Sequence, residues 1–149
     1  MRSASGKLAY SNQVFRLCMG SGRPVCWERL DTSGSVPHGR AFHAAVLLEG
    51  TRIVVFGGIG ALGMTAQCVL FDVHTTQWSK VFQSAAGGCE VPSPRHGHSM
   101  TETKDKSTAV LFGGAGAGFF NDVHFIDCFT GCPFSPALSS GPVQCRSCA

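Results

Sequence analysis

The sequence predicts an all-β protein built from repeated units, and three observations lead to this fold class. A short apolar run that ends in a glycine pair, RIVVFGG at residues 52–58, returns as AVLFGG at residues 109–114. The landmarks around the two copies also recur, at a common spacing of about 55 residues, and such self-similarity is typical of stacked repeat proteins. Finally, the 149 residues include 19 Gly and only 14% charged residues, which suits buried strands joined by many turns.

The landmarks follow one another in the same order in both copies. An Arg-x-x-His sequence comes first, as Arg40 and His43 in one copy and as Arg95 and His98 in the other. The glycine pair ends the apolar strand and removes two Cβ atoms, which permits a positive φ and a close approach of a neighbouring backbone. The glycine pairs and the acids that end the next strand are Gly57, Gly58 and Asp72 in the first copy and Gly113, Gly114 and Asp127 in the second.

This order of landmarks resembles the kelch repeat, whose unit of roughly 50 residues forms one four-stranded blade of a β-propeller. Residues 37–82 resemble one whole unit, with Trp78 as the later aromatic anchor. Residues 91–128 resemble a second unit in part, because Pro133 stands where the spacing places the second Trp. The resemblance implies an incomplete kelch-type β-propeller of about two to two and a half four-stranded antiparallel blades.

The N-terminal part of the chain is interpreted as a loose end followed by half a blade. Residues 1–11 show no sustained periodicity, so we expect them to be disordered. Residues 12–30 can be aligned with the end of the second unit and are interpreted as the outer strands of a partial blade, at 14–17 and 26–30.

The first complete unit contains four apolar runs separated by turn residues. Residues 30–39, rich in Ser, Gly and Pro, are expected to form a loop that leads into it, and the glycine-rich residues 58–64 form a loop inside it. The four predicted strands are 44–48, 52–56, 67–72 and 77–82.

The second unit repeats this pattern as far as its third strand. The predicted strands are 100–103, 108–112 and 122–127. Residues 129–149, rich in Cys, Pro and Ser, supply no clear fourth strand and are expected to form an irregular tail. Each blade of a propeller buries its face on the next one, so a chain with so few blades is expected to expose apolar faces and to be able to self-associate.

The Arg-x-x-His pairs are interpreted as structural rather than ligand-binding. Both copies keep the same two residues, whereas a specific ligand would rarely use every blade alike. In the kelch frame, each Arg is expected to pair with a carbonyl or an acid of the neighbouring blade, and each His to hydrogen-bond a turn. Trp78 and Trp27 are expected to be packing anchors between blades.

Three residues that vary between the copies are candidates for contact with a partner. His96 breaks the repeat, and Phe119 and Phe120 lie in the loop that follows the second glycine pair. The resemblance to kelch proteins implies a non-enzymatic scaffold or adaptor that binds another protein through its variable loops. Because fold alone does not specify a function, this role is an expectation from the resemblance.

The C-terminal cysteines carry a second hypothesis, a propeller fragment with a zinc-binding tail. Cys128 and Cys132 form one close pair, and Cys145 and Cys148 form another, near the spacing with which four thiolates enclose a tetrahedral zinc ion. Disulfides and unligated thiols remain open as alternatives.

Other classes of function are disfavoured by composition. The net charge of +3 is small and the basic residues are scattered, so neither a nucleic acid nor a membrane is expected as partner. No apolar run approaches the ~20 residues of a membrane-spanning helix. No nucleophile elbow, zinc-protease or phosphate-loop motif occurs, so no cofactor is expected and the remnant of a kelch-type enzyme is the last hypothesis. The absence of a secretory signal favours a reduced, cytoplasmic location, with an organellar transit segment in residues 1–27 as the alternative.

Overall fold

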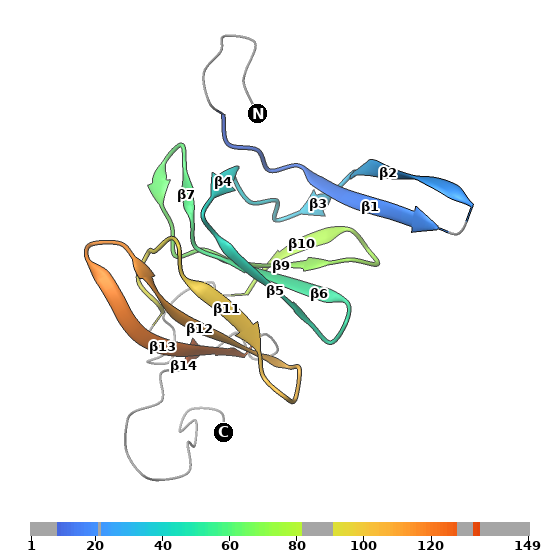
Figure 1. Ribbon diagram of the computed structural model, residues 1–149. Helices are drawn as coiled ribbons and strands as arrows, with labels where there is room; N and C mark the ends of the chain where they lie inside the picture. Colours follow the sequence, from blue (N-terminus) through green and yellow to red (C-terminus); the bar gives the residue numbers. More distant parts are fainter. Residues whose placement is uncertain (1–8, 21, 82–90, 128–132, 135–149) are drawn as a thin grey trace.

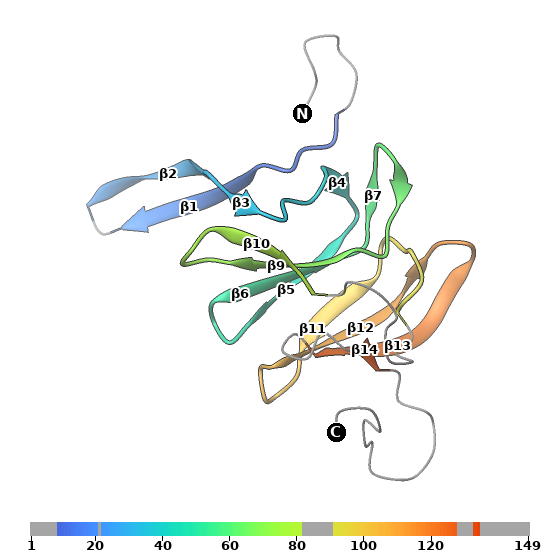
Figure 2. The same cartoon turned by 180° about the vertical axis from the view of Figure 1, so that it is seen from behind.

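The structure, a computed structural model, describes residues 9–20, 22–81, 91–127 and 133–134. This part of the chain contains only β-strands, turns and loops, as the sequence predicts. The strands form four sheets, and three of these are arranged along one direction (Figures 1 and 2). A two-stranded hairpin lies at one end, a five-stranded sheet in the middle, and a four-stranded sheet at the other end.

The middle sheet contains the four strands predicted for the first complete unit. They are β5 (Ala44–Leu48), β6 (Arg52–Phe56), β9 (Cys68–Asp72) and β10 (Gln77–Lys80). All neighbours among these four pair antiparallel, in the order β10-β9-β6-β5. This is the order that a propeller blade requires, with consecutive strands lying side by side.

A short fifth strand extends the middle sheet at its outer edge. The strand β3 (Ser33–Gly34) pairs parallel with β10, and Ser35 N donates to the Trp78 carbonyl at 2.8 Å. The prediction of a plain loop over residues 30–39 is therefore wrong at this point. Gly34 has a φ of 82° and approaches the backbone of Trp78 so closely that a Cβ atom would overlap it.

The last sheet repeats the arrangement of the middle sheet. It consists of β11 (Ser99–Glu102), β12 (Thr108–Ala115), β13 (Phe119–Asp127) and β14 (Pro133–Phe134), in that order. The strand β14 corrects the expectation that residues 129–149 supply no fourth strand. Pro133 pairs with Ile126 just as Trp78 pairs with Phe71. Pairing with β13 thus places a strand there although the aromatic anchor is missing, and a proline is tolerated in an edge strand.

The hairpin at the other end consists of β1 (Val14–Gly20) and β2 (Arg23–Leu30). Both strands were predicted, and both are longer than expected. Their register places Leu17 opposite Trp27, the same relation that joins Phe71 to Trp78. The hairpin therefore corresponds to the outer two strands of a repeat unit.

A minor sheet stands apart from the three main ones. It consists of β4 (Arg40–Ala41), β7 (Ile59–Gly60) and β8 (Gly63–Met64), which pair antiparallel. The prediction that residues 58–64 form an unpaired loop is wrong. The segment turns back on itself and pairs with the Arg-x-x-His segment, a long-range contact that no local sequence pattern signals.

Two buried apolar layers hold the main sheets together. Because successive side chains of a strand point to opposite faces, a strand between two sheets must be apolar throughout, which explains the run in β6. Between the middle and last sheets the buried residues are Leu48, Val54, Phe56, Cys68, Ala109, Leu111 and Ile126. Between the hairpin and the middle sheet they are Val55, Val69, Phe71 and Trp78, with Val14 and Leu30 packed against them.

Candidate functional site

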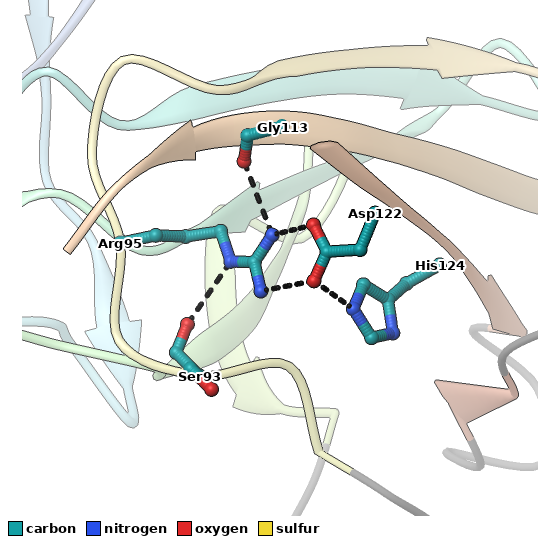
Figure 3. A network of polar contacts seen from close by, with 5 residues as sticks. All are labelled: Ser93, Arg95, Gly113, Asp122 and His124. Atoms are coloured by element: carbon teal, nitrogen blue, oxygen red, sulfur yellow. Dashed lines mark hydrogen bonds and ion pairs between the residues drawn. The ribbon is translucent and has the colours of Figure 1, made fainter. Parts of the chain in front are cut away.

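The most extensive polar network of the last sheet is centred on Arg95, whose side chain is only 1% exposed (Figure 3). Its guanidinium group donates to both carboxylate oxygens of Asp122, at 2.6 and 2.8 Å, and to the Gly113 carbonyl at 3.1 Å. Its Nε donates to the Ser93 carbonyl at 3.1 Å. Arg95 and a hydrogen bond from His124 hold the pKa of Asp122 far below its usual range. The network therefore locks the loop before β11 to the strands β12 and β13.

Arg40 makes the equivalent contacts in the first unit. It donates to the His38 carbonyl at 3.2 Å, to the Gly57 carbonyl at 3.1 Å, and to the side-chain oxygen of Gln67. A neutral amide thus takes the place of the carboxylate of Asp122. The side chains of both arginines bond within their own unit, which corrects the expectation that they pair with a neighbouring blade.

The glycine pair is the point at which the two units meet. Gly57 and Gly58 both have a positive φ, and Gly58 N donates to the Arg95 carbonyl at 2.8 Å. A Cβ atom on Gly57 would lie 2.6 Å from that same carbonyl oxygen and 2.9 Å from Cε1 of His98. A side chain here would force the units apart, so the close contact between them requires glycine.

His98 lies in the same contact between units and is buried. Its ring packs edge-on against the ring of Phe56 in the middle sheet, with centroids 5.5 Å apart. Burial, and then the positive charge of Arg95, lower the pKa of His98 to about 4, and His43 and His96 add further positive charge around it.

We therefore expect the stability of the protein to fall as the pH drops from 6.5 to about 4. In this range the unfolded chain binds a proton at His98 that the folded chain does not, so the linkage favours unfolding. Thermal unfolding should be measured across this range for the wild type and for His98→Gln, which cannot titrate there. A melting temperature of His98→Gln that falls as steeply with pH as that of the wild type would contradict the assignment.

Several large apolar side chains are exposed on or next to the loops of the two units. Phe119 is 97% exposed and Leu62 is 88% exposed, and Phe42 and Met64 are exposed as well. In Figures 1 and 2 the turn between β7 and β8 and the bend between β12 and β13 project from the same side of the molecule. We call these four residues the loop surface.

Two residues of the loop surface, Leu62 and Met64, line a cavity. A cavity of about 710 Å³ is lined by Leu62, Met64 and Tyr10, and also by Arg40. Phe42 is held beside the second unit because its carbonyl accepts a hydrogen bond from Gly97 N at 2.9 Å. Its ring centroid lies 6.2 Å from that of His96. The surface thus combines exposed apolar groups with a neighbouring recess.

Comparison with known proteins agrees with the repeat pattern in the sequence. The sequence model of the KLHDC2/KLHL20/DRC7 Kelch-repeats domain matches residues 4–149. The chain belongs to the kelch-repeat family. Kelch-repeat domains are in general non-enzymatic interaction modules.

Several curated proteins are similar to this chain. The Rab9 effector protein with kelch motifs of Mus musculus is 37% identical over 101 residues, which are 65% of this chain and 25% of that protein. The serine/threonine-protein phosphatase BSL2 of Arabidopsis thaliana is 32% identical over 108 residues, which are 68% of this chain and 10% of that protein. Host cell factor of Drosophila melanogaster is 37% identical over 83 residues, 54% of this chain and 5% of that protein. The kelch chain thus spans at most about a quarter of the length of these relatives.

The kelch fold places the predicted partner-binding residues in different surroundings. Phe119 is fully exposed on the loop surface. Phe120 is half buried, with the guanidinium carbon of Arg95 4.1 Å from its ring centroid. His96 is also half buried, beside Phe42.

Sequence reasoning missed Phe42 and Leu62 as individual residues of the surface. A large apolar side chain within a turn-rich segment was the available signal in both cases. Phe42 also has a φ of 58°, which is uncommon for a residue other than glycine. This conformation turns the chain between Arg40 and His43 and leaves the Phe42 ring on the outside.

The hypothesis of a zinc-binding tail concerns residues that the structure does not describe. Cys128, Cys132, Cys145 and Cys148 all lie outside the described ranges. Among the described residues, no group of three or more His, Cys, Asp or Glu is placed to hold a metal ion. The described part of the kelch chain also contains no helix long and apolar enough to cross a membrane.

Proposed function

We propose that this chain is a non-enzymatic scaffold that binds another protein through the loop surface of Phe42, Leu62, Met64 and Phe119. The observation that carries the proposal is that loops of both units expose large apolar side chains, and that two of these side chains, Leu62 and Met64, line a cavity. Apolar patches of this kind on a folded protein mark interaction sites. Aromatic side chains and a recess next to them are common features of the residues that dominate binding energy.

The polar groups of the chain support a structural rather than a catalytic reading. Arg95 and His124 both donate hydrogen bonds to Asp122, and Arg95 is almost wholly buried. A general base or nucleophile must reach a substrate. The hydrogen bonds of this network instead connect the loop before β11 to the strands β12 and β13. The general role of kelch-repeat domains as interaction modules agrees with this proposal.

Replacing Phe119 and Leu62 together by serine is expected to weaken partner binding by at least about tenfold, because aromatic and aliphatic anchors carry most of the energy of such contacts. The melting temperature should stay close to that of the wild type, since both side chains are exposed. A partner captured by the tagged wild-type chain should be purified, and its affinity for both chains measured by calorimetry.

A matched control is Val25→Ser, which also removes an exposed apolar side chain but lies on the hairpin, away from the loops. It should leave partner affinity unchanged. If the double variant bound the purified partner as tightly as the wild type, the loop surface would not be the binding site.

A further inference from the structure

The contact between the middle and last sheets is an interface with two different faces. One face is on the middle sheet and includes Val54 and Phe56, both fully buried. The other is on the last sheet and includes Leu111 and Ile126, which are equally buried. Because the chain repeats, each kind of face has a second copy elsewhere in the molecule.

The second copy of the first face lies at the outer side of the last sheet. Val110 and Phe112 hold the positions in β12 that Val54 and Phe56 hold in β6, two and four residues into the apolar run before each glycine pair. Phe56 is 0% exposed, whereas Phe112 is 52% exposed. Val110 is partly exposed as well. The same side chains that fill the interface inside the chain are therefore presented to solvent at this end.

The second copy of the other face lies on the hairpin. Leu17 and Trp27 are cross-strand partners, as are Phe71 and Trp78 in the middle sheet. Trp78 is 8% exposed and packs under the hairpin, whereas Trp27 is 69% exposed. Cross-strand partners point to the same face of a sheet, so Leu17 and Trp27 form one apolar patch. Phe15, Met19 and Val25 are also exposed on these two strands.

We propose that the open face of β12, with Phe112, packs on the open hairpin face, with Trp27, of a second copy of this chain. The two faces are the two halves of one interface that the molecule already builds internally, so their apolar character matches. Figures 1 and 2 show the hairpin and the last sheet at opposite ends of the three main sheets, so one molecule cannot join its own two faces without distortion. The contact is head-to-tail, and such a contact leaves one face open at each end of the assembly, which allows further copies to add or a ring to close.

The first test is the assembly state of the wild-type chain. Light scattering after size-exclusion chromatography should show an average mass that rises with protein concentration, to at least about twice that of the monomer. The emission of tryptophan should shift to shorter wavelength over the same range. The chain has two Trp residues and Trp78 is already buried, so the shift reports the burial of Trp27.

The second test separates the head-to-tail contact from a symmetric one. Trp27→Glu places a charge in the hairpin face, and Phe112→Glu places a charge in the face of β12. Both positions are exposed, so neither substitution should disturb folding. Each variant alone should stay monomeric, because it lacks one half of the interface. An equal mixture should form a complex of about twice the monomer mass and grow no further, because each chain still offers the face that the other lacks.

The control is Phe119→Glu, which places the same charge on an exposed phenylalanine of the loop surface and should associate like the wild type. A wild-type chain that remains monomeric with unshifted emission would overturn the proposal. So would a Phe112→Glu variant that still associates alone, since that result indicates a symmetric contact between hairpins. Because Phe119→Glu is expected to lose partner binding but not self-association, failure of one proposal leaves the other intact.

Discussion

Replacing Arg95 by methionine is expected to lower the free energy of unfolding by about 3 kcal/mol, the lower end of the range for removing one partner of a buried ion pair, because the Arg95 side chain is buried and that of Asp122 is partly exposed. Methionine keeps much of the length of the side chain and removes every donor. The carbonyl oxygens of Gly113 and Ser93 then lose this donor, and the carboxylate of Asp122 keeps the hydrogen bond from His124 but loses the guanidinium group. Urea denaturation of the purified variant, followed by circular dichroism, should measure this loss.

The repeat offers a matched control at the same position of the first unit. Arg40→Met removes the equivalent side chain, but Arg40 is partly exposed and contacts the neutral Gln67 instead of a carboxylate. We expect a loss of about 1–2 kcal/mol, as for ordinary hydrogen bonds that solvent can partly replace. Equal losses for the two variants would show that the ion pair with Asp122 adds nothing to stability.

The second large effect is expected for Gly57→Ala. This substitution should lower the free energy of unfolding by about 3 kcal/mol or more, because it strains the backbone and overpacks the contact between the units. Gly57 is buried, has a φ of 66°, and would bring its new Cβ to 2.6 Å from the Arg95 carbonyl oxygen. That oxygen belongs to the backbone of the other unit, so it can move only if the two units separate. Denaturation should show the loss, and hydrogen exchange should show faster opening of the contact around His98.

The control for this substitution is Gly50→Ala in the exposed turn between β5 and β6. Gly50 also has a positive φ, 73°, but no atom lies within 4 Å of the position of a new Cβ. The free energy of unfolding should therefore fall by only about 1 kcal/mol, the cost of a positive φ at a residue with a side chain. The difference between the two variants measures the steric part alone, and a difference near zero would mean that the units need not approach so closely at Gly57.

The strands of both units could be predicted from the sequence because their signals are local. An apolar run such as residues 53–56, followed by two glycines, identifies a strand and its end without knowledge of its neighbours. The recurrence of the run then placed the second unit, although β12 extends past its glycine pair, which was expected to end it. Kelch membership, suggested by the same landmarks, is shown by the match over residues 4–149.

The five two-residue strands β3, β4, β7, β8 and β14 could not be predicted. Each is too short to show alternation and exists only because another segment offers backbone partners, as β10 does for β3 and β13 for β14. The partners of the two arginines were missed for a related reason. Gln67 and Asp122 are distant in sequence from Arg40 and Arg95, and only the folded unit brings them together.

The sequence by itself determined that this protein is an all-β chain with a repeated unit, because apolar runs, glycine pairs and turn residues act within a few positions of one another. The tertiary structure alone decided which copies of that unit are covered. Trp27 and Trp78 occupy equivalent positions, as do Phe112 and Phe56, yet one of each pair is exposed and the other buried. Burial depends on the sheet that packs alongside, and that neighbour is not encoded in the residue or its immediate sequence.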